Sequence, residues 1–408
     1  MPSVFGVPRT MKSAGQDHQT TDRPRAHGRD GGTRPGLIAR GLAALSRLLA
    51  LLVLAGLLLK GIGEFVSDRY AWSQWLEWSP NLLVAAGSLA VLVLATLIAR
   101  LASRAARPWL LGRSARWVLR AAWAAFLVHA VYTIVVDVPF YRPRPAGPGS
   151  LDNSMRILFW NAAVHERDGW EDAVINDAPD VVVLVGLSSR GPLPKILESM
   201  PDDATRLVYD RFTVLSALPL VRFGFTHLNI EAGEGYDPRL PEGRRAQYDP
   251  GAAMYVEIGG RRDEDPPTTL WIVDLPSDIS LSRSRVTREA RAAIDAFDGM
   301  RMIRTANDSW TIEPGTGYAG PKGFPTPDLI IGDFNIPRGA ASLSRLNMGF
   351  PDAFDQAATG YRASWPRRLP LWHLDQAFIG PRFRAWRYQV RDAGSGAHLM
   401  QVVDVTPQ

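Results

Sequence analysis

Three long apolar stretches dominate the first third of the chain, at residues 41–59, 78–99 and 121–136. The second stretch carries no charge, the first is interrupted by Arg47, and Arg120 precedes the third. A helix needs about 20 apolar residues to cross the hydrocarbon core of a bilayer. Long basic side chains near helix ends can reach the interface. The pattern predicts three transmembrane helices, and a buried helical bundle in a soluble protein is the alternative.

The pattern changes from Met155 onward, where short apolar runs alternate with polar segments. Residues 181–185 form a β-branched run that is typical of a strand buried on both faces. The strands that we expect are residues 156–160, 181–185, 212–215, 253–258, 269–273, 329–331, 374–379 and 400–405. Helices are expected at residues 171–178 and 284–297. Strands interleaved with helices predict a layered α/β or α+β domain.

These patterns divide the chain into four parts. Residues 1–36 are polar and lack apolar periodicity, which predicts a disordered cytoplasmic tail. Residues 37–140 are the expected three-helix transmembrane region. Residues 141–154 are rich in proline and glycine and predict a stiff linker. Residues 155–408 form the expected globular domain.

The charges are distributed unevenly. Residues 1–150 hold 18 Lys and Arg against 7 Asp and Glu, whereas residues 151–408 hold 28 against 34. Five arginines lie in residues 22–40 and five in residues 100–116, but residues 60–77 contain only Lys60 and Arg69. The positive-inside rule therefore predicts a multi-pass protein of the cell membrane with an extracytoplasmic C-terminal domain. Trp72, Trp75 and Trp78 would form an aromatic belt at the outer interface.

The chain contains no cysteine, which excludes disulfides, zinc–thiolate sites and a cysteine nucleophile. Its most informative motif is PDLIIGDFNIPR at Pro327–Arg338. A buried strand here ends in Asp333 and Asn335, which lie on the same side of the chain. A carboxylate and an amide so placed can hold a cation and orient a phosphate or a water. The alternative is that both residues are present because they favour the turn after the strand.

The GDFN motif resembles that of the endonuclease/exonuclease/phosphatase superfamily, and further motifs support the resemblance. MRILFWNAA is similar to the first strand of that superfamily, which ends in an asparagine, here Asn161. PDVVVLVGL resembles its second strand, ASWPRRLPLWHLDQAFIG its Trp-Pro and Ile-Asp-His segment, and GSGAHLM its Gly-Ser-Asp-His motif. The resemblance places the histidine-orienting aspartate at Asp375 and the catalytic histidine at His398. It implies a four-layer sandwich of two mixed β-sheets flanked by helices.

The three preceding spans resemble those of bacterial membrane phosphatases of the teicoplanin-resistance type. The sequence also departs from the superfamily pattern. The second strand ends in Val185-Gly186, where the resemblance implies Gln and the metal-binding Glu. Ala397 stands where the terminal motif has an aspartate. The central strand ends in Asp274, in the position of a polar catalytic residue.

The resemblance and the acids that remain imply a rearranged site for Mg²⁺ or Mn²⁺. Mg²⁺ usually binds through one or two carboxylates, and Asp333 and Asp274 would supply two. Asn161 would add an amide oxygen, and Asn335 would orient the attacking water. His398, held by Asp375, would bind and polarise a phosphoryl oxygen.

Structural explanations stand beside these roles. The Asp375–His398 pair can be a structural hydrogen bond, and Asp274 can cap the helix that follows it. Ser188 and Ser189 are weak candidates for a nucleophile, because no base can be assigned to them. The arginines of the helix expected at 284–297 and its approach form a solvated face or contact anionic headgroups. They are Arg283, Arg285, Arg288 and Arg291.

Three functions follow from this sequence. The first is a membrane-anchored, metal-dependent phosphoric ester hydrolase whose partners are the lipid bilayer and a lipid-linked or other extracytoplasmic phosphate. The second is a catalytically degenerate binding or scaffold module at the membrane. The third is a nuclease, but nucleic acid is not an expected partner. Phosphate contacts dominate affinity for nucleic acids, and the domain is mildly acidic.

Overall fold

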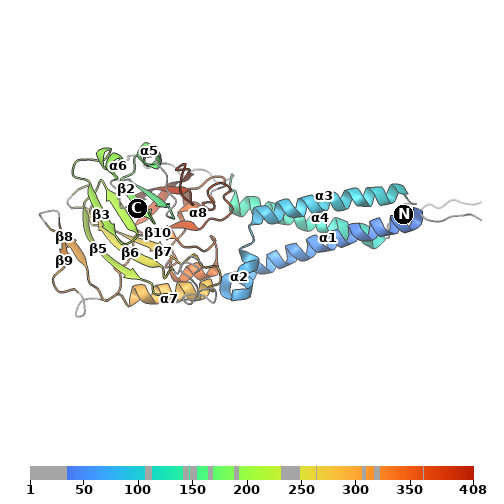
Figure 1. Ribbon diagram of the computed structural model, residues 1–408, viewed down its shortest axis with the longest axis horizontal. Coiled ribbons are helices and arrows are strands. Elements are labelled where there is room, and N and C mark those ends of the chain that lie inside the picture. Colours follow the sequence, from blue (N-terminus) through green and yellow to red (C-terminus); the bar gives the residue numbers. More distant parts are fainter. Residues whose placement is uncertain are drawn as a thin grey trace, which may run out of the picture.

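The computed structural model describes residues 35–105, 113–140, 147, 154–163, 169–187, 193–230, 249–262, 264–305, 309–316, 322–361 and 363–408. Residues 1–34 of the predicted tail, part of the arginine-rich loop and most of the linker at 141–154 therefore lie outside the described residues. The described chain forms a long helical bundle with a layered domain at one end (Figure 1).

The bundle consists of α1 (Pro35–Val66), α3 (Asn81–Ala105) and α4 (Arg113–Asp137). All three helices are long and apolar enough to cross a membrane, which confirms the three predicted apolar spans. Small residues let the helices approach closely, since Ala50 of α1 and Ala122 of α4 are fully buried. The Ser46 hydroxyl also donates to the carbonyl of Ala95 at 2.8 Å.

A short connection between α1 and α3 joins the bundle to the domain. It contains a 3₁₀ turn, η1 (Ser67–Arg69), and α2 (Ala71–Glu77). This connection lies at the domain end of the bundle, whereas the end of α3 and the beginning of α4 lie at the opposite end (Figure 1). The loop with few basic residues is thus on the side of the domain, whereas Arg100 and Arg104 near the end of α3 and Arg116 near the start of α4 are toward the other end.

The domain contains two mixed sheets, as predicted. The first has the order β12-β13-β1-β2-β4-β3 and the second has the order β11-β10-β7-β6-β5-β8-β9. Strands of the first sheet are β1 (Met155–Asn161), β2 (Val181–Val185), β3 (Thr205–Tyr209), β4 (Phe212–Ser216), β12 (Phe383–Arg391) and β13 (Met400–Pro407). Those of the second are β5 (Leu220–His227), β6 (Ala252–Ile258), β7 (Thr268–Asp274), β8 (Met302–Arg304), β9 (Trp310–Ile312), β10 (Leu329–Asp333) and β11 (Asp375–Ile379).

Three apolar clusters show why the domain has four layers. The main cluster lies between the sheets and includes Phe159 and Val183 from one sheet and Met254 and Ile272 from the other. A second cluster packs the outer face of the second sheet on α7 (Arg283–Asp295) and η4 (Ala341–Arg345). The third packs the first sheet on α5 (Trp170–Asn176) and α6 (Pro194–Glu198). The last helix, α8 (Ala353–Ala357), packs against β12.

The strands predicted from continuous apolar runs are present, but several others escaped prediction. These are β3, β5, β8, β9 and β12, which form hairpins or lie toward the sheet edges. In β12, charged residues interrupt the apolar positions, because one face of the strand is accessible to solvent. A search for continuous apolar runs therefore finds the sheet centres and misses the margins.

The central strand pairs bring the motif residues to one edge of the domain. Strand β1 runs parallel to β2, and β10 runs parallel to β7. In the second sheet Asp333 is level with Asp274 on one side and with Asp375 of antiparallel β11 on the other. Three acids from separate segments are consequently neighbours across three strands.

Candidate active site

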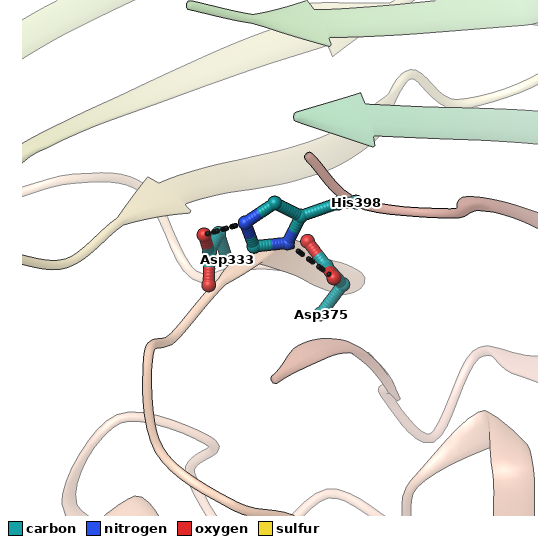
Figure 2. A group of neighbouring side chains, drawn as sticks. All are labelled: Asp333, Asp375 and His398. Carbon is teal, nitrogen blue, oxygen red and sulfur yellow. Dashed lines mark hydrogen bonds and ion pairs between the residues drawn. The ribbon is translucent and has the colours of Figure 1, made fainter. Parts of the chain in front are cut away.

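His398 lies between two buried carboxylates (Figure 2). Its Nδ1 is 2.9 Å from Asp375 Oδ2, and its Nε2 is 3.6 Å from Asp333 Oδ2. All three residues are almost completely buried. This arrangement fixes the imidazole on its Asp375 side and directs Nε2 toward Asp333. The structure therefore brings together the histidine and the aspartate that the motifs paired.

The two carboxylates determine the charge of the imidazole. Burial lowers the pKa of His398, but the negative charges of Asp375 and then Asp333 outweigh it and raise the pKa to about 9. Burial raises the pKa of Asp333 to about 6, although the charge of His398 opposes that change. At neutral pH the pair accordingly consists of an imidazolium and a carboxylate, which are an acid and a base 3.6 Å apart.

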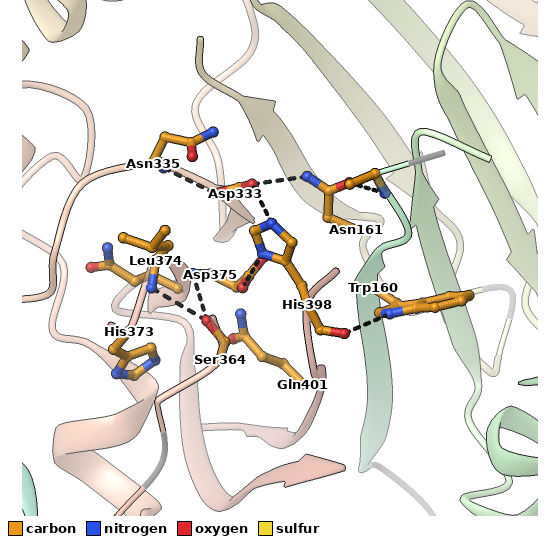
Figure 3. Close-up of polar contacts among 12 residues, drawn as sticks. Trp160, Asn161, Asp333, Asn335, Ser364, His373, Leu374, Asp375, His398 and Gln401 are labelled. Atoms are coloured by element: carbon orange, nitrogen blue, oxygen red, sulfur yellow. Dashed lines mark hydrogen bonds and ion pairs between the residues drawn. The ribbon is translucent and has the colours of Figure 1, made fainter. Parts of the chain in front are cut away.

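The two asparagines of the predicted site meet at Asp333 (Figure 3). The Asn161 amide donates to Asp333 Oδ2 at 2.8 Å, and the Asn335 backbone N–H donates to Asp333 Oδ1 at 2.9 Å. Asp333 thus closes a turn and also belongs to the cluster. The Asp333 carboxylate therefore stabilises the turn, as the alternative interpretation expected, and also lies in the cluster with His398.

Surrounding residues hold the pair in position. The Ser364 hydroxyl accepts from the backbone N–H groups of Leu374 and Asp375 at 3.3 and 3.2 Å. The Trp160 indole donates to the His398 carbonyl at 3.1 Å. Gly396, at φ +76°, lies so close to the Trp160 ring that a Cβ would come within 2.5 Å of it. The glycine of the GSGAHLM segment therefore allows the loop to place His398.

Asp274 has a different partner from the one the sequence suggested. It does not cap α7, which begins at Arg283 after the N-cap residue Ser282. Instead Arg211 Nη1 donates to Asp274 Oδ2 at 2.8 Å and to Asp249 Oδ1 at 2.7 Å. Burial raises the pKa of Asp274 to about 7, against the opposing charge of Arg211.

Sequence reasoning missed Arg211 and Asp249. Both lie far from the motifs in sequence. Arg211 is in a β-hairpin turn, Asp249 precedes β6, and Arg211 bonds to both Asp249 and Asp274. The one available signal was the segment Arg206–Ser216, RLVYDRFTVLS, in which Asp-Arg separates two strand-like runs. That signal predicts a two-residue hairpin turn. It does not predict that the turn lies next to Asp274 at the end of β7.

These residues open into one cavity of about 1010 Å³. Its lining includes Asn161, Arg211, Asp249, Asp274, Asp333, Asn335 and His398. Trp75, Trp78, Ser79 and Pro80 of the α1–α3 connection also line it. Since this connection joins two membrane-spanning candidates, part of the cavity is built by the membrane region itself.

Specific contacts hold the α1–α3 connection on the domain. The Gln74 side chain accepts from the backbone N–H of Arg283 at 2.9 Å and donates to the carbonyl of Leu281 at 3.3 Å. The Trp372 indole donates to the carbonyl of Trp78 at 2.8 Å. Asp68 accepts from both the backbone and the hydroxyl of Ser342. The position of the domain against the bundle is therefore fixed at several points.

Arg283 is part of this contact and is not on a solvated face. It is fully buried, its guanidinium donates to the carbonyls of Pro276 and Asp278, and it lies 5.1 Å from the centre of the Trp78 ring. Arg285 and Arg291 pair with acids one turn later on α7. The interpretation of these arginines as one solvated or headgroup-binding face was thus wrong for Arg283. Trp78 is likewise partly enclosed by the domain. Ser188 and Ser189 lie outside the described residues.

Three lining residues lack the side chains that a metal site needs. Gly186 and Ala397 stand where the resemblance implies acids, and Ala163, which adjoins Gly186, also lines the cavity. We call Ala163, Gly186 and Ala397 the bare positions. None offers a side-chain oxygen, so they do not fit a Mg²⁺ or Mn²⁺ ion, which takes hard oxygen ligands.

The remaining acids offer an incomplete alternative. Asp333, Asp375 and His398 each present one ligand atom within 4.8 Å of the others and could hold a metal ion by distance. However, Asp375 and His398 already bond to each other. Asp274 is bonded to Arg211. The assignment of Asp333 and Asp274 as metal ligands stays a prediction.

Comparison with known proteins gives likenesses of fold. No family model matches the chain, and no curated protein matches its sequence. A solved endonuclease/exonuclease/phosphatase of Beutenbergia cavernae is 16% identical over 62% of this chain and 72% of its own, with a TM-score of 0.38. A conserved protein of unknown function from Enterococcus faecalis is 15% identical over 62% of this chain and 100% of its own, with a TM-score of 0.41.

A third match is the inositol polyphosphate 5-phosphatase domain of a synaptojanin, solved with inositol (1,4)-bisphosphate and calcium. It is 10% identical over 62% of this chain and 86% of its own, with a TM-score of 0.34. The solved structures that match the chain thus include endonuclease/exonuclease/phosphatase proteins, and the resemblance to that superfamily indicated by the motifs is a resemblance of fold.

Proposed function

We propose that this protein is a membrane-anchored phosphoesterase that hydrolyses a lipid-linked phosphate at the bilayer surface. One observation carries the proposal. The cavity that contains His398 and Asp333 is lined on another side by Trp75 and Trp78, which belong to the connection between two membrane-spanning candidates. An acid–base pair therefore faces a space that the membrane region helps to enclose.

The residues of the cluster suggest a division of roles in hydrolysis. Water would attack phosphorus, forming a new P–O bond while the bond to the lipid oxygen breaks. The water proton would pass to the Asp333 carboxylate, and the lipid oxygen would take the Nε2 proton of His398. Asp375 would stabilise the imidazolium, and Asn335 would orient the water. No step is assigned to a metal ion, because the bare positions do not supply its ligands.

The position of the cavity favours a lipid substrate over a soluble one. Trp75 is half exposed, and tryptophan is enriched where a membrane meets water. A lipid headgroup would enter beside Trp75 and Trp78 while its chains stayed in the bilayer. Because the domain is bonded to the α1–α3 connection, the distance between the bilayer and His398 is held constant.

We further propose that the domain is extracytoplasmic and that the protein resides in the cell membrane. The domain and the α1–α3 connection lie at one end of the bundle (Figure 1). The end of α3, with Arg100 and Arg104, and the beginning of α4, with Arg116, lie at the other end. The positive-inside rule then favours a cytoplasmic arginine-rich end. Nucleic acid is not a proposed partner, since phosphate contacts dominate affinity for nucleic acids and residues 151–408 hold 28 Lys and Arg against 34 Asp and Glu.

The second candidate is a binding module that holds a lipid headgroup without hydrolysing it. The bare positions favour this candidate, since two of them stand where the resemblance implies acids. The two candidates differ in whether the His398–Asp375 pair performs chemistry or only binds phosphate. Hydrolysis therefore separates them.

The test uses the full-length protein in nanodiscs. We expect release of phosphate from a diacylglycerol phosphate in the nanodisc to be at least roughly tenfold faster than from soluble glycerol phosphate. That ratio corresponds to about 1.4 kcal/mol of preference for the lipid. His398→Ala is the matched control and should lower the rate by roughly 10²–10⁴-fold. Binding of the lipid without phosphate release would contradict the proposal and support the binding module.

A further inference from the structure

Arg211 reaches the candidate site because of a hairpin turn. Strands β3 and β4 pair with Tyr209 level with Phe212, so Asp210 and Arg211 form a two-residue turn. Strand β4 also pairs with β2, which places this turn beside the end of β2. There the backbone N–H of Gly186 donates to the Arg211 carbonyl at 3.0 Å. Arg211 is thus anchored next to the strand end that lacks its acid.

The guanidinium is surrounded by carboxylates. Its Nη1 bonds to Asp249 at 2.7 Å and to Asp274 at 2.8 Å, and its Nε lies 3.6 Å from Asp210. Only a quarter of the side chain is exposed, and Asp274 is buried. Arginine stays protonated in proteins, and here Asp274 and Asp249 raise its pKa further despite the opposing effect of burial. A permanent positive charge is therefore fixed between three acids.

Neighbouring atoms crowd the position of Gly186 at the end of β2. Gly186 has φ +63°, and a Cβ at that position would meet Asn161 Oδ1 at 3.3 Å and the Ala163 backbone nitrogen at 3.4 Å. A carboxylate side chain at 186 would have to share this space. Because residue 186 is a glycine, the acids next to the turn are Asp210, Asp249 and Asp274. Arg211 donates hydrogen bonds to the last two.

We infer that the guanidinium of Arg211 occupies the cation position of this site in place of a divalent metal ion. The acids near it are the hard oxygen ligands that Mg²⁺ or Mn²⁺ would use. Asp249 and Asp274 direct oxygens at one guanidinium nitrogen instead. Among the described residues, both hydrogen bonds of the guanidinium come from Nη1, so Nη2 remains available for an anion that enters the cavity.

This inference predicts that removal of Arg211 exposes a cation site. In the wild-type protein a divalent ion would have to displace a bonded guanidinium. In Arg211→Ala, Asp249 and Asp274 would face one another without a counter-ion. Two close carboxylates repel each other, and a divalent ion would relieve that repulsion. Loss of a positive charge should therefore produce a gain of metal binding.

The experiment is a titration of the full-length protein in detergent micelles with Mn²⁺ alone, monitored by calorimetry and by electron paramagnetic resonance. We expect no stoichiometric binding by the wild type and one Mn²⁺ site in Arg211→Ala. The Mn²⁺ affinity of the variant should exceed that of the wild type at least roughly tenfold. Arg211→Lys is the matched control, since it retains the charge and should gain no site. Arg211→Ala with Asp249→Asn should bind Mn²⁺ more weakly than Arg211→Ala alone.

Two results would overturn the inference. One is stoichiometric Mn²⁺ binding by the wild type that Asp274→Asn abolishes; this measurement does not require any Arg211 variant to fold. The other is an Arg211→Ala protein with wild-type near-ultraviolet circular dichroism and no gain of Mn²⁺ binding. Neither readout involves hydrolysis, so the inference can stand or fail independently of the proposed function.

Discussion

Two groups of residues in the cavity lining differ in how much of the expected chemistry they retain. Around His398, the predicted polar residues are present and bonded: Asp375 bonds to His398 at 2.9 Å, the Asn161 amide bonds to Asp333 at 2.8 Å, and the backbone N–H of Asn335 bonds to Asp333 at 2.9 Å. At the bare positions, Gly186 and Ala397 stand where the resemblance implies acids, and the backbone N–H of Gly186 donates to the Arg211 carbonyl. Under the inference drawn above, the guanidinium of Arg211 supplies the positive charge of the site.

This difference explains why the motifs alone gave an ambiguous function. Loss of metal ligands usually indicates lost chemistry, whereas a buried histidine between two carboxylates is a costly arrangement that is common at functional sites. The inferred role of the Arg211 guanidinium would reconcile the two observations. It would supply positive charge in the cavity without the acids that a metal ion requires.

The largest expected effect comes from changing the acid–base pair. Asp375→Asn would remove the charge that holds the imidazolium, and we expect the rate to fall by roughly 10²-fold or more. In the wild type, activity requires ionised Asp333 and protonated His398. It should therefore decline as the pH falls through about 6 and as it rises through about 9.

In Asp375→Asn the pKa of His398 should fall, so the alkaline decline should move to lower pH. Rates measured from pH 5 to pH 10 test this. An unchanged alkaline limb in the variant would contradict the assignment of that limb to His398. A wild-type rate that is independent of pH across this range would contradict the roles of both residues.

A smaller effect is expected at the bare positions. Gly186 adopts φ +63°, which side chains other than glycine adopt only with strain, and a Cβ would also touch Asn161 and the backbone of Ala163. Gly186→Ala should lower the free energy of unfolding by about 1–3 kcal/mol, as measured by chemical denaturation. Ala163→Ser is a nearby control that should change it less. If Gly186→Ala were as stable as wild type, the bare positions would have room for a ligand-bearing side chain.

The sequence predicted the parts of this molecule that depend on local pattern. The continuous apolar runs of β2 and β10 identified central strands, and motif residues at their ends identified Asp333 and the pair of Asp375 with His398. The inferences from the sequence needed only periodicity, strand ends or a recognised motif. The pairing of β7 with β10, which places Asp274 beside Asp333, came from the structure.

The parts that were missed depend on long-range contacts. Arg211 bonds to Asp274, which is 63 residues away, and Gln74 contacts Leu281, which is 207 residues away. Neither residue shows its role through spacing or composition. From the sequence, Trp75 and Trp78 were predicted to lie at the membrane interface. The structure shows that they line the cavity, because the α1–α3 connection contacts the domain.

The most direct test of the account is hydrolysis in the presence of a chelator. Full-length protein in nanodiscs that contain diacylglycerol phosphate would be assayed with excess EDTA, and then with added Mg²⁺ or Mn²⁺. We expect phosphate release to persist in EDTA, to change little when either ion is added, and to be lost in Arg211→Ala. Phosphate release that stops in EDTA and returns with Mg²⁺ or Mn²⁺ would contradict the account and show that a metal ion supplies the positive charge.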